Sequence, residues 1–217
     1  MRMFKNVLGC VACAFFLAPL AAQAAPLTIV NVGAPAINCV FNTTCTVTVS
    51  DSIGTFVPPG DGGTGRLQSR TYVGAPGAPA AGLTAYEYRV DMTSATAANP
   101  NKANCVSKLI LDFGPEATLP YAHAVTHPGA IDGQVFVVTS GGLGTIGLSS
   151  ADQIGNVIYF TFSKPVCPKP LIATAVIPGE TSFFFGLASK TMPKPSTAHL
   201  VYSLGGGGAT GDRVPTH

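Results

Sequence analysis

The chain has 217 residues, of which 47% are hydrophobic and only 10% are charged, and its formal net charge is +2. An ordinary soluble domain has roughly 25% charged residues. The low and balanced charge argues against a nucleic-acid-binding protein, which needs a concentrated basic surface, and against a disordered polyelectrolyte, which needs a high net charge.

The first 24 residues have the pattern of a secretory signal peptide. Arg2 and Lys5 form a short basic region, an apolar stretch covers residues 7–22, and an Ala-Gln-Ala run ends at Ala24. Small residues at these positions are read by signal peptidase, so we expect cleavage after Ala24 and a secreted protein, extracellular or periplasmic. An uncleaved membrane anchor is the alternative. Beyond residue 24 no apolar run approaches the ~20 residues of a membrane span.

Four cysteines follow the leader: Cys39, Cys45, Cys105 and Cys167. An even number of cysteines in an oxidising compartment favours disulfides, although four cysteines allow three connectivities. Because a short, turn-like segment joins Cys39 to Cys45, we predict the pairs Cys39–Cys45 and Cys105–Cys167. A four-thiolate zinc site is the alternative, but its usual Cys-x₂-Cys spacing is absent.

Alternating apolar and polar residues are the main signal for secondary structure. Residues 45–50 alternate in this way, and residues 84–92 do so most clearly. In 84–92 one face carries Tyr86, Tyr88, Val90 and Met92, and the other carries Glu87, Arg89 and Asp91. This period of two predicts a strand whose charged face is solvated.

Further predicted strands cover residues 27–32, 66–73, 106–113, 135–139, 157–162, 182–188 and 199–204. Clusters of Pro and Gly separate them, and only residues 149–153 favour a helical turn. So many short strands without crossover helices predict antiparallel sheets. We therefore expect an all-β, single-domain antiparallel β-sandwich over residues 25–204, with jelly-roll and Ig-like topologies both open, and a flexible C-terminal tail over residues 205–217.

Candidate metal ligands are few. His123 and His127 have the i, i+4 spacing of a zinc pair, with His199 as a third candidate, but prolines flank the first two and Ala124 stands where a catalytic Glu would be. We expect a solvated loop and no metal or cofactor. Four aspartates in turns are candidate calcium ligands, although turn formation is favoured for them. They are Asp51, Asp61, Asp132 and Asp152.

No catalytic motif is present: the chain has no Gly-x-Ser-x-Gly element, and the glycine-rich residues 140–144 are not expected to open a helix. Few carboxyl groups are available for a glycosidase pair, although Glu87, Glu116 and Glu180 stay open individually. We expect no enzyme. Tyr72, Tyr86 and Tyr88 could stack on sugars if exposed. Residues 183–185, three consecutive phenylalanines, are expected to form a strand buried on both faces.

Three segments of the chain resemble secreted bacterial β-proteins of the kind that often carry PEP-CTERM sorting signals. The segments are residues 38–41 with 45–52, 132–138 and 179–189. The resemblance implies export and association with the cell surface or matrix. However, residues 211–217 contain no Pro-Glu-Pro, apolar helix or basic cluster, so it does not imply membrane anchoring.

Together these observations predict an exported, non-enzymatic protein with a structural or interaction role at the cell surface or in the extracellular matrix. Its partner would be an unknown protein or glycan and not a nucleic acid, and exposed strand edges could pair with a partner strand. The alternative is a carbohydrate-binding or calcium-stabilised binding module. A secreted hydrolase with a site built from distant residues is a third hypothesis.

Overall fold

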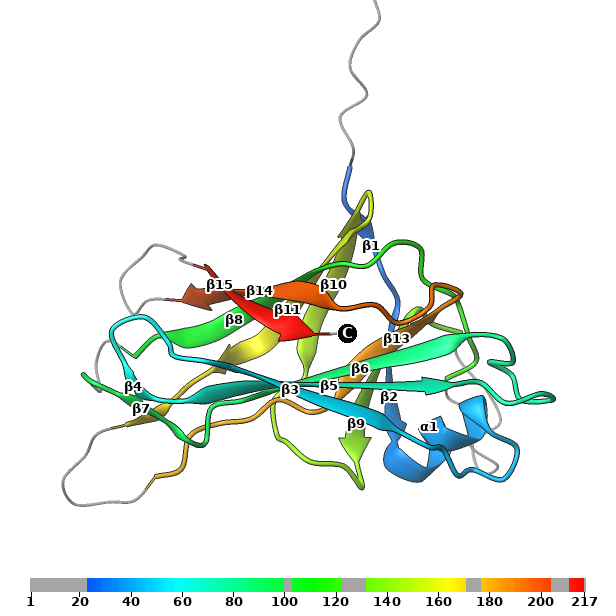
Figure 1. Cartoon of the computed structure of the whole chain (residues 1–217), viewed down its shortest axis with the longest axis horizontal. Helices are drawn as coiled ribbons and strands as arrows, with labels where there is room; N and C mark the ends of the chain where they lie inside the picture. Colours follow the sequence, from blue (N-terminus) through cyan, green and yellow to red (C-terminus); the bar gives the residue numbers. More distant parts are fainter. Residues whose placement is uncertain (1–22, 100–102, 122–131, 171–176, 204–210, 217) are drawn as a thin grey trace, which may run out of the picture.

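The computed structural model describes residues 23–99, 103–121, 132–170, 177–203 and 211–216, and its main feature is two packed six-stranded β-sheets (Figure 1). Sheet A is antiparallel throughout. Its strands, in spatial order, are β1 (Ala25–Pro26), β10 (Leu148–Ile154), β11 (Val157–Val166), β8 (Cys105–Asp112), β14 (Ser196–Ser203) and β15 (Gly211–Thr216).

Sheet B carries the face on which the candidate site lies. Its strands, in spatial order, are β2 (Ile29–Gly33), β9 (Val135–Ser140), β13 (Phe185–Ser189), β6 (Thr84–Asp91), β5 (Gly65–Val73) and β3 (Ser50–Phe56). All neighbours are antiparallel except β2 and β9. A third, small sheet contains β12 (Lys169–Pro170), β7 (Ala95–Ala97) and β4 (Gly62–Gly63). The all-β sandwich predicted from the sequence is therefore confirmed.

The central core lies between the two sheets and contains side chains from both. Sheet A contributes Leu109, Phe160 and Leu200, while sheet B contributes Tyr88 and Phe185, all at most 1% exposed. The whole apolar face predicted for residues 84–92 lies in this core, with three of its residues on β6 and Met92 directly after it. Alternation along a strand places these residues on one side, so the local pattern was sufficient to identify them.

A second cluster, the outer core, covers part of the opposite face of sheet B. It forms around helix α1 (Ala34–Phe41), whose buried residues Ile37, Val40 and Phe41 pack with Phe136 and Phe184. Val40 and Phe41 follow Ile37 by three and four residues, a spacing that places all three side chains on one face of the helix. Figure 1 shows α1 next to β2 and apart from sheet A. Phe184 thus lies in the outer core and Phe185 in the central core, so burial on both faces is confirmed. The predicted strand is not, because of residues 183–185 only Phe185 belongs to β13.

The two ends of the described chain connect the sheets along their edges. At one edge, β1 pairs with β10 of sheet A and β2, three residues later, pairs with β9 of sheet B. At the other edge, Gly54 of β3 faces β15 so closely that a Cβ there would lie 2.5 Å from the Pro215 carbonyl oxygen. The two sheets are therefore connected at both edges of the sandwich. At one edge the N-terminal segment crosses from sheet A to sheet B, and at the other β3 and β15 are in direct contact.

Several local expectations were wrong. Residues 149–153 belong to strand β10 and not to a helical turn, whereas Ala34–Phe41, for which no helix was predicted, form α1. Of the predicted strand 45–50 only Ser50 is extended in a sheet, because pairing with β5 begins there. The predicted flexible tail is also wrong for Gly211–Thr216, because this segment pairs with β14 and Val214 is fully buried in the central core.

Candidate functional site

An open groove of about 360 Å³ lies on the outer face of sheet B, and we call it the outer groove. Its polar lining residues are Asn38, Arg70, Tyr72 and Glu87. Its other lining residues are Ala34, Ile37, Val47, Val49, Val138, Gly141, Gly142, Leu143 and Phe184. A hollow lined mainly by apolar residues, with a few polar groups among them, is the usual form of a small-molecule site.

Helix α1, the segment leading into β3 and the turn after β9 form the walls of the outer groove, and β5 and β6 form its floor. A second hollow, beside Tyr86 and Met192, has a volume of only about 20 Å³. That is room for about one water molecule, so it offers no comparable site.

Glu87 is the buried carboxyl group of the floor. Its side chain is on β6 and only 6% of the residue is exposed. The Tyr72 hydroxyl donates a hydrogen bond of 2.7 Å to Glu87 Oε1. Burial raises the pKa of the Glu87 carboxyl, although the hydrogen bond from Tyr72 and the charge of Arg70 lower it. Burial and the nearby Glu87 charge raise the pKa of Tyr72 well above its usual value, so the tyrosine keeps its proton.

Arg70 supplies the positive charge of the outer groove. Its Nε donates to Oδ1 of Asp51 at 2.8 Å, and its guanidinium carbon lies 4.1 Å from the centre of the Phe184 ring. Arg70 and Glu87 face each other across the β5–β6 pair. Stacking on an aromatic ring and a hydrogen bond to a carboxylate both fix the plane of the guanidinium. The orientation of Arg70 is therefore set by the protein before any ligand binds.

The charged face predicted for residues 84–92 is not solvated as expected. Glu87 is buried beneath the outer core, and Arg89 and Asp91 are partly buried in an ion pair of 3.5 Å. Arg89 Nε also donates to Gln68 Oε1, and its guanidinium carbon lies 5.3 Å from the centre of the Phe184 ring. The alternation was predicted correctly. The prediction of solvent exposure was wrong because α1 and Phe184, which are far from residues 84–92 in the sequence, cover this face of the strand.

The three tyrosines considered for sugar stacking are all buried. Tyr72, Tyr86 and Tyr88 are at most 4% exposed, so none presents a ring face to solvent. Tyr86 and Tyr88 belong to the central core, and Tyr86 donates to the Thr191 carbonyl oxygen at 2.6 Å. Tyr72 packs in the outer core, and it is one of the residues that line the outer groove. A flat sugar platform built from these rings is thus excluded.

The residues considered for metals do not converge in the described part of the chain, where no group of three His, Cys, Asp or Glu side chains could hold an ion. Asp61 accepts hydrogen bonds from the backbone nitrogens of Ala98 and Asn104, at 3.0 and 2.9 Å, so its carboxylate links its own turn to distant segments. Asp152 accepts from Ser150 Oγ. Asp132 is exposed and His199 lies in β14. His123 and His127 lie outside the described residues.

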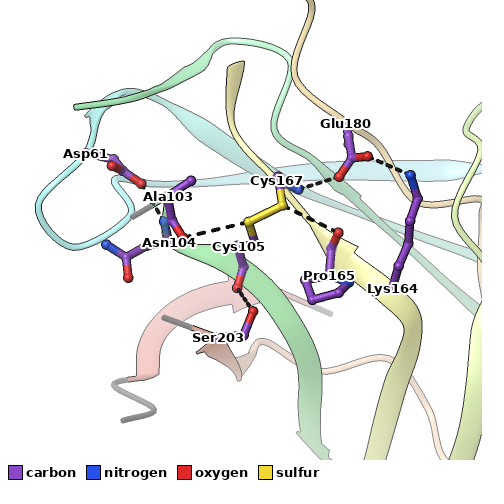
Figure 2. Close-up of a disulfide and its surroundings, with 9 residues drawn as sticks. All are labelled: Asp61, Ala103, Asn104, Cys105, Lys164, Pro165, Cys167, Glu180 and Ser203. Carbon is purple, nitrogen blue, oxygen red and sulfur yellow. Dashed lines mark hydrogen bonds and ion pairs between the residues drawn. A yellow bond between two sulfur atoms is a disulfide. The ribbon is translucent and has the colours of Figure 1, made fainter. Parts of the chain in front are cut away.

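Both predicted disulfides, Cys39–Cys45 and Cys105–Cys167, are present. Figure 2 shows Cys105–Cys167, which joins the start of β8 to the segment after β11. The Glu180 carboxylate holds this end of the sandwich by accepting from the Cys167 backbone nitrogen at 2.9 Å and from Lys164 Nζ at 2.7 Å. Cys39–Cys45 joins α1 to the segment that carries Val47 and Val49, so it connects two walls of the outer groove.

No known family model, curated protein or solved structure matches this chain. Within the described residues, no helix has the length and apolar character needed to cross a membrane.

Of the residues that line the outer groove, the sequence singled out Glu87, Tyr72, Phe184 and the glycine-rich run over residues 140–144, but each for a different role. Arg70 and the apolar walls were not identified, because no local pattern indicates that α1, the turn after β9 and β5 come together. The one local signal for Glu87 was a carboxyl group in the middle of a strand rich in tyrosine.

Proposed function

We propose that this chain is an exported, non-enzymatic binding protein of the cell surface or extracellular matrix, and that it binds its ligand in the outer groove. Export is supported by the predicted signal peptide over residues 1–24. The two disulfides fit the same interpretation, because such bonds persist in oxidising compartments.

The observation that carries the binding role is the outer groove itself. Its volume of about 360 Å³ lies within the range of small-molecule sites, and its apolar walls surround a buried carboxyl group and an oriented guanidinium. The Cys39–Cys45 bond restrains two of its walls. A rigid, partly formed site favours binding because less conformational freedom is lost when the ligand enters.

Export is tested by expressing the full chain in a bacterial host and measuring the intact mass of the product in the cell envelope and the medium. We expect loss of residues 1–24 and of four hydrogens, one pair for each disulfide. An unprocessed, reduced chain confined to the cytoplasm would contradict the proposal.

Binding is tested by ligand-observed NMR with a library of small apolar and polar fragments. Leu143→Arg places a charged side chain on the groove wall at a residue that is 57% exposed, so the fold should tolerate it. Val73→Arg is the matched control, because Val73 is 66% exposed but does not line the groove. We expect fragments whose signals are lost with Leu143→Arg and retained with Val73→Arg. Fragments that respond equally to both variants would refute a binding role for the groove.

A further inference from the structure

Several polar atoms at the floor of the outer groove have no protein partner. Glu87 uses Oε1 to accept from Tyr72, and among the described residues no hydrogen bond reaches Oε2. Arg70 uses Nε to donate to Asp51, and within the same residues neither terminal nitrogen of its guanidinium makes a hydrogen bond. Both groups therefore keep hydrogen-bonding capacity for a molecule that enters the groove they line.

These groups are arranged to donate hydrogen bonds. Burial favours the neutral form of the Glu87 carboxyl. Because Oε1 already accepts from Tyr72, the proton of the neutral form belongs on Oε2, where it is available as a donor. The terminal nitrogens of Arg70 carry only donors. The floor of the groove therefore suits a ligand group that accepts several hydrogen bonds and carries negative charge.

The rest of the groove is apolar. Ile37 of α1, Val47 and Val49 before β3, and Val138 and Leu143 around the turn after β9 line it, and none of them can pair with a charge. A ligand that fits both parts has one anionic head and an apolar body.

We propose that the outer groove binds an apolar monocarboxylate, whose carboxylate accepts hydrogen bonds from Glu87 Oε2 and from the Arg70 guanidinium while its hydrocarbon body lies against Ile37, Val49 and Leu143. This inference rests on the proposed binding function. Carboxylate and guanidinium form two parallel hydrogen bonds in their preferred geometry, and Phe184 beneath Arg70 holds the guanidinium for that contact.

At pH values above the Glu87 pKa, binding takes up one proton, because the ligand and Glu87 together form one carboxyl–carboxylate pair. The other titratable groups that act on Glu87 are Tyr72 and Arg70 on β5 and Asp51 on β3. Tyr72 keeps its proton, and Arg70 stays charged, so Glu87 is the group that must gain the proton. Affinity should then fall as the pH rises above the Glu87 pKa, by up to about tenfold per pH unit.

The test compares four probes with the same eight-carbon chain and different heads: octanoate, octanamide, octanol and octylamine. Each is titrated calorimetrically, below its micelle-forming concentration, into the exported, oxidised protein at pH 5.5 and pH 8. We expect octanoate to bind most tightly at pH 5.5 and to weaken at least several-fold at pH 8, while octanol and octanamide change little.

Three variants locate the interaction. Glu87→Gln keeps a donor at the same position but does not titrate, so octanoate should bind it with nearly equal affinity at both pH values. Arg70→Gln should weaken octanoate by about tenfold or more at both, the effect of losing a charge-assisted hydrogen bond. Arg66→Gln is the matched control, because Arg66 lies on the same face of β5 but outside the groove, and it should have no effect.

Tightest binding of octylamine, equal binding of all four heads, or no binding of octanoate would each overturn the inference. Equal binding that is lost with Leu143→Arg would leave the proposed binding function intact, because the groove would then bind through its apolar walls alone. A failure of the fragment screen described above would instead remove the binding function itself.

Discussion

Tyr72 and Glu87 are diagonal neighbours on β5 and β6, and they share a hydrogen bond of 2.7 Å on a face of sheet B that the sequence predicted to be solvated. The pair belongs to both the outer core and the outer groove: the Tyr72 ring packs against Phe41, with ring centres 5.0 Å apart, while Glu87 lines the groove. The packing of the outer core and the proposed binding therefore depend on the same contact.

Glu87→Gln should remove part of the pH dependence of stability. Because burial raises the Glu87 pKa, the folded state holds the proton more tightly than the unfolded chain. The free energy of unfolding of the wild type should thus decrease as the pH rises from the usual Glu value to the raised one, by at most about 1.4 kcal/mol per pH unit. Urea denaturation at pH 4.5, 6 and 8 measures this slope.

The control for Glu87→Gln is Asp112→Asn, which changes an exposed carboxylate at the end of β8. The decrease of the unfolding free energy with pH should persist in Asp112→Asn and be smaller in Glu87→Gln. Identical slopes in the two variants would show that Glu87 does not titrate differently in the folded state.

Tyr72→Phe should destabilise the fold by about 1–3 kcal/mol, because it leaves the buried Oε1 of Glu87 without its donor. It should also raise the pKa of Glu87 further, since the hydrogen bond from Tyr72 favours the charged carboxylate. A double-mutant cycle with Glu87→Met, which removes the acceptor, is measured by urea denaturation at pH 8 and isolates the coupling. A coupling free energy near zero would mean that the two side chains do not interact in solution.

The two disulfides should contribute unequally. In the chain-entropy model, closing the loop of 62 residues between Cys105 and Cys167 stabilises by about 4 kcal/mol, and closing the loop of six between Cys39 and Cys45 by about 2 kcal/mol. Urea denaturation of the paired Cys→Ala variants checks this order.

The short bond should matter more for the groove, so its removal should weaken fragment binding while removal of the long bond should not. The reverse pattern would contradict the assignment of Cys39–Cys45 to the groove walls.

Gly54→Ala should open the edge where β3 meets the C-terminal strand. The added Cβ would lie 2.5 Å from both the Pro215 carbonyl oxygen and Val214 Cγ1, so β15 or β3 must move. Overpacking of this kind costs about 1–3 kcal/mol. Hydrogen exchange should become faster at Val214 and stay unchanged at Leu109, in the middle of sheet A. Gly62→Ala controls for the loss of a glycine, because the added Cβ would make only an ordinary contact of 3.8 Å with the Thr96 carbonyl oxygen. Unchanged exchange at Val214 would contradict a tight contact.

Local patterns were sufficient for the parts of the fold that local residues determine. The alternation of Tyr86, Tyr88 and Val90 identified the central face of β6, and the short separation of Cys39 and Cys45 identified both disulfides by elimination. The strand face and the Cys39–Cys45 bond depend on neighbours within a few residues, and the physics that produces them is local.

The remaining features depend on contacts between distant segments. An isolated helix as short as α1, with Pro35 in its first turn, is marginal in water and forms here because Val40 and Phe41 pack on sheet B. Strand β10 has one buried residue, Ala151, so its main-chain pairing with β11 outweighs its weak side-chain pattern. The groove is formed by segments that come together only in the folded chain, so its residues were recognised separately and not as one site.

The crossing of residues 25–33 from sheet A to sheet B also bears on the order in which the protein folds. The first strands of the chain have their partners more than 100 residues later: Ala25 faces Gln153, and Ile29 faces Val135. A nascent chain therefore holds its earliest strands unpaired until most of the sequence is available. Such distant pairing slows folding to milliseconds or longer. A polypeptide that is slow to acquire its final structure has time to be threaded, still extended, through a translocation channel.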